Sequence, residues 1–160
     1  MIGYCPICLS ETEVFTALQG SNILKCINCG LGITENLKGQ VSDYHRDESY
    51  IKEEKLFENI FQKRVNIMME VVKPKTVLEI GCSTGLLLSL FVRKSCEVAG
   101  VELSKKATEV ARSRGIEVIL GDFLKVKIDK KFDLIIFNHT LEHVEDPVKF
   151  INQASAALNK

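Results

Sequence analysis

The chain has 160 residues, and its 21 lysines and arginines are balanced by 21 aspartates and glutamates. Its hydrophobic fraction of 46% is typical of an ordinary globular protein with one or two domains, and it excludes a largely disordered chain. The zero net charge and the lack of a dense basic run argue against nucleic acid or an anionic membrane surface as a partner.

The N-terminus shows neither the basic region nor the apolar stretch of a signal peptide. No apolar run approaches the ~18 residues that span a bilayer. We therefore expect a cytoplasmic protein with no membrane partner, in a compartment that keeps cysteines reduced.

The first 40 residues contain two Cys-x-x-Cys pairs, Cys5 with Cys8 and Cys26 with Cys29. The seventeen residues 9–25 separate the pairs, which suits a closed zinc site of four thiolates. Such a site has no open position, so we expect a structural Zn²⁺ that replaces a core too small to fold alone. The pattern resembles a zinc ribbon, and four unrelated thiols are the alternative interpretation.

Residues 41–74 are predicted to form a connecting segment. Apolar residues recur at helical spacing from about residue 48 to residue 72, and Pro74 then ends the pattern. Tyr44 and Tyr50, just before this helix, suggest a lid over a binding site, although simple packing of the two rings is the favoured interpretation.

Residues 75–160 alternate short apolar runs with helical stretches, which predicts an α/β unit. Strands this uniformly apolar are usually covered on both faces, as in a parallel sheet flanked by helices. Ser104 is a natural N-cap, and Gly115 stands where a left-handed residue would end that helix. The strands are predicted within residues 76–80, 97–102, 116–120 and 132–138.

A final helix is predicted from Asp146 or Pro147 to the end of the chain, because proline is favoured in the first turn of a helix. Its apolar residues recur at helical spacing and should form one buried face. They are Val148, Ile151, Ala154 and Leu158.

The turn after the first predicted strand of the sheet carries Gly81 and Gly85. It departs from the G-x-G-x-x-G dinucleotide pattern, because Ser83 and Leu88 occupy the second and third glycine positions. Glu79 precedes the turn, and its carboxylate would repel a pyrophosphate at the following helix. The expected ligand therefore lacks phosphate and offers cationic groups, as an adenosyl compound with a sulfonium and an α-amino group does.

Acidic residues also end the next two predicted strands. Glu102 is placed to accept both hydroxyls of a ribose, while Asp122 and Phe123 offer an acceptor for an exocyclic amine and an aromatic face for a purine. Taken alone, each acid has another interpretation, as a cap partner, a solvated strand end or a turn residue. The carboxyl ends of neighbouring parallel strands share one edge, so together they predict a single crevice.

The segments VLEIGCSTGLLL, VAGVELS, GDFL and FDLIIFNHTLEHVEDP resemble the successive motifs of class I S-adenosylmethionine-dependent methyltransferases, over residues 76–150. The resemblance implies an α/β, Rossmann-like parallel sheet, with S-adenosyl-L-methionine as the cofactor. The commoner motif has a glycine where this chain has Ser83. The residues implied to bind the cofactor are Glu79, Gly81, Cys82, Ser83, Gly85, Glu102, Leu103, Asp122, Phe123 and Asn138.

His143 and His139 are the candidate catalytic residues, since histidine is the usual general base near neutral pH and both follow the fourth predicted strand. A histidine that only hydrogen-bonds neighbouring backbone is the favoured alternative. Glu142 with His143 also resembles the metal-binding pair of quinone-biosynthesis methyltransferases, but we do not expect that metal because His139 replaces a further acid.

The resemblance implies methyl transfer to a small molecule or a nucleotide-linked sugar, because a zinc ribbon ahead of such a domain is similar to enzymes of sugar and cell-surface polysaccharide biosynthesis. Two alternatives stay open. One is a ribosomal-RNA methyltransferase, against which the neutral charge argues. The other is a truncated, non-catalytic zinc-ribbon interaction protein.

The family fold has seven strands in the order 3-2-1-4-5-7-6, and the sequence supplies the first four. We therefore expect a C-terminally truncated domain whose fourth strand is an apolar edge. Such a chain is expected to bind the cofactor weakly by itself, and pairing of two exposed edges in a homodimer would partly compensate.

Overall fold

The computed structural model describes residues 3–18, 21–35 and 53–159. The chain divides into two compact units, residues 1–44 and 45–160. Each unit is described by itself. The two tyrosines of the predicted lid, Tyr44 and Tyr50, lie outside the described residues.

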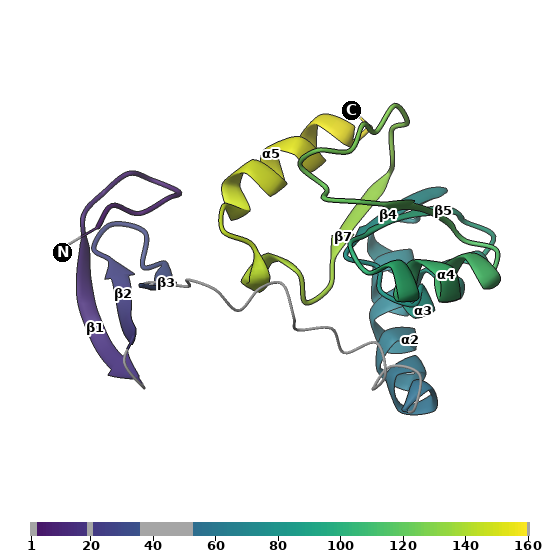
Figure 1. Cartoon of the computed structure of the whole chain (residues 1–160), viewed down its shortest axis with the longest axis horizontal. Helices are drawn as coiled ribbons and strands as arrows, with labels where there is room; N and C mark the ends of the chain where they lie inside the picture. Colours follow the sequence, from purple (N-terminus) through teal and green to yellow (C-terminus); the bar gives the residue numbers. More distant parts are fainter. Residues whose placement is uncertain (1–2, 19–20, 36–52, 160) are drawn as a thin grey trace. The chain divides into compact units, whose positions relative to one another are not determined.

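The first unit is a small antiparallel sheet with the strand order β1-β2-β3 (Figure 1). The ladder between the first two strands shifts its register between Val14 and Thr16. The strands are β1 (Thr12–Leu18), β2 (Ser21–Cys26) and β3 (Gly32–Thr34).

The second unit contains a parallel sheet with the order β6-β5-β4-β7, so the predicted α/β architecture is confirmed (Figure 1). In this sheet Glu79 pairs in register with Gly100 on one side and with Ile136 on the other. The strands are β4 (Thr76–Ile80), β5 (Glu97–Glu102), β6 (Glu117–Leu120) and β7 (Leu134–Phe137).

Helices cover both faces of this sheet. Three helices pack on one face around Val65, Leu88 and Phe91, and the fourth packs on the other face around Phe123 and Ala154 (Figure 1). The first three are α2 (Glu54–Val71), α3 (Leu86–Val92) and α4 (Lys105–Ser113). The fourth is α5 (Pro147–Ala157), which follows the short 3₁₀ helix η1 (Leu141–His143). None of the helices in the described part of the chain combines the length and apolar character that a membrane crossing demands.

The predicted ends of α4 are confirmed. Ser104 caps the helix by accepting a hydrogen bond from the Ala107 amide at 3.2 Å, and Gly115 follows it with a φ of 80°. A left-handed residue at this point terminates the helix without the steric cost that a β-carbon would bring.

The predicted extent and face of the last helix are partly wrong. The helix ends at Ala157, and Leu158 is extended and forms a parallel bridge with Phe132. Ile151 is 46% exposed. The buried side of α5 is instead built by Phe150 and Ala154, which pack against the apolar layer on this face of the sheet. The tertiary contacts of the ring of Phe150 therefore decide which side of the helix faces inward.

Candidate cofactor site and metal centre

The turn between β4 and α3 combines three residues with positive φ: Gly81 at 75°, Ser83 at 46° and Gly85 at 73°. A β-carbon at Gly81 would lie 2.6 Å from the Thr140 Oγ1 atom, and one at Gly85 would lie 2.5 Å from the Ile116 Cδ1 atom. Both positions therefore require glycine, for the backbone angle and for the close approach. Ser83 tolerates a conformation that is costly for a residue with a side chain, and such strain is common at binding sites.

Hydrogen bonds join the carboxyl ends of all four strands. The Gly81 amide at the end of β4 donates to the Val101 carbonyl of β5 at 2.8 Å, and the Gly121 amide after β6 donates to the Glu102 carbonyl at 2.8 Å. The Thr140 hydroxyl, in the loop after β7, donates to the Ile80 carbonyl at 2.9 Å. These three hydrogen bonds thus hold together the strand ends at which the crevice is predicted.

Glu102 lies directly beside the glycine turn and is 8% exposed. Its Oε2 atom accepts a hydrogen bond from the Ser83 amide at 2.8 Å, and its Oε1 atom accepts from the amides of Leu103 and Ser104, both at 2.8 Å. A carboxylate has about four acceptor sites, so these three bonds leave capacity for one further donor. Leu103 itself is exposed.

Glu79 is the most buried acid of the site, with 2% exposure. Its Oε2 atom is buried and accepts no hydrogen bond from the described residues. Burial, reinforced by the negative charge of Glu102, raises the pKa of Glu79 well above its usual range. Glu79 therefore combines a raised pKa with a buried oxygen that lacks a donor among the described residues.

Cys82 is a buried packing residue of the turn. A β-carbon on Gly100 would lie 2.4 Å from the Cys82 Sγ atom, which shows how closely the thiol covers β5. Burial and the nearby acids Glu79 and Glu102 raise the pKa of Cys82, so the thiol stays protonated.

Asp122 and Phe123 follow β6, as predicted. Asp122 accepts a hydrogen bond from the Leu124 amide at 3.0 Å and pairs with the Lys125 ammonium at 3.1 Å, and the Lys125 contact is the main cause that lowers the pKa of Asp122. Phe123 is only 3% exposed. Its ring packs in the core at 6.2 Å from the ring of Phe137 and at 5.4 Å from that of Phe150. The aromatic face predicted to be open for a purine is thus covered.

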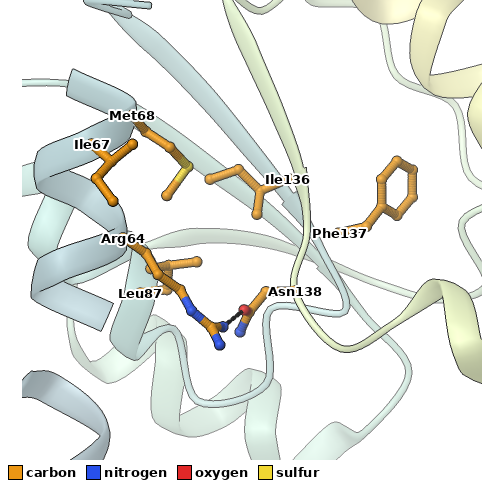
Figure 2. Close-up of a pocket in the computed structure, with 7 residues that line it drawn as sticks. All are labelled: Arg64, Ile67, Met68, Leu87, Ile136, Phe137 and Asn138. Carbon is orange, nitrogen blue, oxygen red and sulfur yellow. Dashed lines mark hydrogen bonds between the residues drawn. The ribbon is translucent and has the colours of Figure 1, made fainter. Parts of the chain in front are cut away.

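A pocket of about 300 Å³ opens at the end of β7 (Figure 2). Arg64 of α2 donates a hydrogen bond to the Asn138 Oδ1 atom in this pocket, while the ring of Phe137 points away from it. Ile67, Met68, Leu87 and Ile136 supply its apolar lining.

Sequence analysis missed Arg64. The available signal was a basic residue on the apolar side of a helix, three residues after the buried Phe61, where an exposed charge is not expected. The guanidinium also lies 5.7 Å from the centroid of the Phe61 ring, within the range of a cation–π contact.

The two candidate histidines lie in the loop after β7. His139 has a φ of 56°, and its Nδ1 atom lies 3.1 Å from the Glu142 Oε1 atom. The His143 amide donates to the Thr140 carbonyl at 3.0 Å at the start of η1. Since the Thr140 hydroxyl is bonded to the end of β4, this loop is held against the glycine turn.

The four cysteines of the first unit come together as predicted. All four sulfur atoms lie within 4.8 Å of one another, with 3.6 Å between Cys5 and Cys29 and 3.4 Å between Cys8 and Cys26. Hydrogen bonds from Ser10 are the main cause that lowers the pKa of the Cys8 thiol to about 5. Sulfur atoms at this spacing suggest a tetrahedral site of the kind that zinc occupies.

Two equivalent turns carry these ligands. The Leu9 amide donates to the Cys5 carbonyl at 2.9 Å, and the Gly30 amide donates to the Cys26 carbonyl at 3.1 Å. Both donors have positive φ, 60° for Leu9 and 74° for Gly30. The sequence indicated this geometry only at the glycine.

Comparison with known proteins agrees with the geometry of the second unit. Residues 53–160 match the family of the methyltransferase domain. The chain belongs to this family. It is 33% identical over 105 residues to an uncharacterized protein of Methanocaldococcus jannaschii, a match that covers 64% of this chain and 49% of that protein. It is 37% identical over 92 residues to a ubiquinone biosynthesis O-methyltransferase of Pelagibacter ubique, covering 52% of this chain and 38% of that enzyme.

Solved methyltransferase structures share the fold. A SAM-bound amino pentose methyltransferase of Micromonospora echinaspora, involved in calicheamicin biosynthesis, superposes with a TM-score of 0.61 at 22% identity, over 78% of this chain and 54% of that one. A SAM-dependent methyltransferase of Clostridium acetobutylicum gives 0.59 at 19% identity, over 71% and 52%. These matches confirm the Rossmann-like fold. The chain spans about half or less of the length of the curated relatives.

Proposed function

We propose that the chain carries the cofactor-binding unit of an S-adenosylmethionine-dependent methyltransferase that acts on a small molecule or a nucleotide-linked sugar. The observation that carries this proposal is the buried carboxyl pair Glu79 and Glu102 at adjacent strand ends around a positive-φ glycine turn. The negative charge of Glu102 beside the turn would repel a pyrophosphate, whereas a ligand with a sulfonium and an ammonium group complements the two carboxyl groups.

The proposed roles follow from the chemistry of the ligand. Glu79 would accept from the α-ammonium group, and the remaining acceptor site of Glu102 would bind a ribose hydroxyl. Arg64 would pair with the carboxylate of the methionine moiety, because it places a guanidinium beside Asn138. Asp122 would accept from the adenine amine.

Phe123 takes a different role in this proposal from the one expected. Its carbonyl accepts a hydrogen bond from the Gln153 amide group of α5, and its ring is anchored between two other aromatic rings. We infer that Phe123 fixes the loop that carries Asp122. The adenine would then contact backbone and aliphatic atoms near this loop and not the ring of Phe123.

Methyl transfer from a sulfonium is an in-line displacement, so holding the two reacting atoms together supplies much of the acceleration. A base is needed when the acceptor must lose a proton. His139, strained and paired with Glu142, and His143 in the same loop are the candidates. The ubiquinone and amino pentose methyltransferases among the relatives support a small acceptor.

In the first unit, we propose that Cys5, Cys8, Cys26 and Cys29 hold a structural zinc ion. Four thiolates leave no coordination position for a substrate, so the metal would stabilise the fold. A non-catalytic zinc-ribbon protein would also bind zinc, but it would not bind the cofactor, and this difference separates the two hypotheses.

A nuclear magnetic resonance titration with S-adenosylhomocysteine tests the cofactor site even if binding is weak. We expect the amides of Gly81, Ser83 and Leu103 to shift, while NAD⁺, which carries a pyrophosphate, leaves them in place. Glu102→Gln should weaken the response about tenfold, equivalent to the loss of one charge-assisted hydrogen bond. Glu97→Gln, at the opposite and exposed end of the same strand, is the matched control. Shifts caused by NAD⁺ alone would contradict the proposal.

The acceptor is tested separately. Labelled S-adenosylmethionine, offered with a phenolic panel and a nucleotide-sugar panel, should transfer its methyl group to one panel only. Transfer to ribosomal RNA instead would favour the alternative assignment.

A further inference from the structure

We propose that binding of the cofactor releases a proton from Glu79, so that the site selects ligands with an α-ammonium group and binds them more tightly as the pH rises. The inference rests on the proposed function and adds to it a reason for ligand selection.

The starting observation is the position of Glu79 inside the sheet. It lies on the central strand β4, in register with Gly100 of β5 and Ile136 of β7, and it is 2% exposed. Its Oε2 atom accepts no hydrogen bond from the described residues. A buried polar atom without a partner is unusual in a native protein, and the donor of a bound ligand would satisfy it.

The groups around Glu79 do not supply a positive charge. Glu102 faces it from β5, and the Cys82 thiol faces it from the glycine turn. The segments β7 (Leu134–Phe137) and α3 (Leu86–Val92) contain no titratable side chain. Arg64 of α2 donates to Asn138 and is not among the groups that shift the pKa of Glu79. An ionised Glu79 would thus be a buried charge next to a second acid, which is strongly unfavourable. The unliganded site therefore holds Glu79 as the neutral acid.

An ammonium group close to Glu79 favours the ionised form of the carboxyl group over the neutral form. An opposite charge within about 4 Å favours the ionised carboxyl group and lowers its pKa. The protonated Glu79 and the ligand's ammonium become a carboxylate–ammonium pair, and the carboxyl proton leaves to the buffer. No bond other than this O–H bond is broken.

The direction of the pH effect follows from linkage. Below the pKa of Glu79 in the unliganded protein, each binding event must first remove a proton, so affinity falls as the pH falls. Above that pKa the carboxylate is already formed and the affinity is constant. A ligand without the amino-acid moiety does not demand ionisation, so its affinity should not change with pH through this group.

Calorimetry on the full chain tests the proton release. S-adenosylhomocysteine is titrated in two buffers of different ionisation enthalpy at about pH 5.5 and at about pH 6.5, both below the pKa of about 8 of an α-amino group, so that this group stays charged. We expect release of up to about one proton, and an affinity that rises by up to about tenfold per pH unit below the pKa of Glu79. The control ligand is 5′-methylthioadenosine, which keeps the adenosine and the thioether but lacks the ammonium group. It should release no proton.

The variant Glu79→Gln supplies the second test. It keeps the shape of the side chain and removes the titration, so S-adenosylhomocysteine should bind more weakly and without pH dependence. The carboxyl carbon resonance of Glu79, assigned by its loss in this variant, should move to the ionised position when the ligand is added to the unmodified chain. This resonance is informative even if the variant folds poorly.

The outcomes separate the two proposals. Binding of S-adenosylhomocysteine with equal enthalpy in both buffers, and with an unmoved Glu79 resonance, would overturn the proton-release inference alone. No binding at either pH, together with no amide shift of Gly81, Ser83 and Leu103 in the magnetic resonance titration, would overturn the proposed function and this inference with it. Equal proton release by 5′-methylthioadenosine would overturn the role of the ammonium group.

Discussion

The two units of the chain stabilise their backbones by different means. The described buried side chains of the first unit are few, namely Cys5, Thr12, Leu24 and Cys26, and two of them are cysteines of the sulfur cluster. The second unit buries apolar layers on both faces of its sheet. Large apolar residues such as Tyr4 and Phe15 stay exposed in the first unit because no second layer covers its sheet among residues 3–18 and 21–35. We therefore expect a unit this small to depend on the metal proposed for its four cysteines, whereas the larger unit depends on packing.

The largest effect is expected from removing one of the four cysteines proposed to bind the metal, which tests whether the first unit needs that metal to fold. Cys26→Ser should unfold residues 3–35 and abolish zinc binding, because three thiolates no longer close the site and zinc binding is coupled to folding. The amide spectrum of the second unit should not change. Native mass spectrometry for zinc and amide nuclear magnetic resonance measure the two effects.

A matched control lies in the second unit. Cys96→Ser replaces a buried cysteine whose thiol donates to the Pro74 carbonyl at 3.2 Å, and serine retains a donor. It should leave zinc binding and the first unit intact. A folded first unit in the zinc-free Cys26→Ser variant would show that its sheet needs no metal.

The next effect concerns the glycine turn of the second unit. Gly81→Ala should destabilise that unit by about 3 kcal/mol, because it combines a left-handed backbone with a clash against Thr140. Gly115→Ala has a similar φ of 80° but no neighbouring atom within 4 Å, so it should cost only about 1 kcal/mol. Chemical denaturation measures both.

The variants Gly81→Ala and Gly115→Ala also separate an effect on cofactor binding from an effect on stability. Only Gly81→Ala should reduce the response to S-adenosylhomocysteine, since a β-carbon at Gly115 meets no atom within 4 Å. Equal losses of stability in the two variants would mean that the contact with Thr140 does not constrain the turn.

Two valines of one helix test the apolar layer directly. Val65→Ala should cost about 2 kcal/mol, because Val65 is fully buried against the sheet and its loss leaves a cavity. Val71→Ala, in the same helix, should be neutral because this side chain is 76% exposed. Denaturation midpoints at a fixed m-value check the difference. Similar values for both would indicate that α2 contributes little to the core.

Local sequence patterns predicted most of the fold. The four strands, the cap at Ser104 and the left-handed Gly115 depend on neighbours within a few residues, and the structure confirms all of them. The cysteine spacing predicted the sulfur cluster for the same reason, since each pair closes through its own turn. Local rules suffice where local contacts decide the geometry.

Long-range contacts explain what the sequence did not show. Arg64 meets Asn138 across 74 positions of the chain, and no short pattern records that contact. The burial of Phe123 depends on Phe137 and Phe150, which come from a later strand and a later helix. The positions of Glu79 and Glu102 were predicted because parallel strands bring their ends together, but the unpaired oxygen of Glu79 required coordinates.

The smallest effect concerns Asp133, a half-buried acid whose hydrogen bonds join segments at the other end of the sheet. Asp133 accepts hydrogen bonds from the amides of Lys75 and Thr76 at 2.8 and 3.0 Å and from the Asn159 side chain at 2.7 Å. These bonds, with Asn159 the largest cause, lower the pKa of Asp133 to about 2.

Because the folded pKa of Asp133 lies below its unfolded value, the stabilisation is present above about pH 4 and is lost as the pH falls towards about 2. Asp133→Asn should therefore lower the melting temperature slightly at neutral pH, and the deficit should shrink as the pH falls through about 2, where the folded carboxylate takes up its proton. Asp129→Asn, whose exposed side chain pairs with Lys127, is the control and should show little effect at either pH. A deficit of Asp133→Asn that persists undiminished in acid would assign the loss to hydrogen-bond geometry and not to charge. In that case the amide bonds, and not the ionised carboxylate, would hold β4 to the segment before β7.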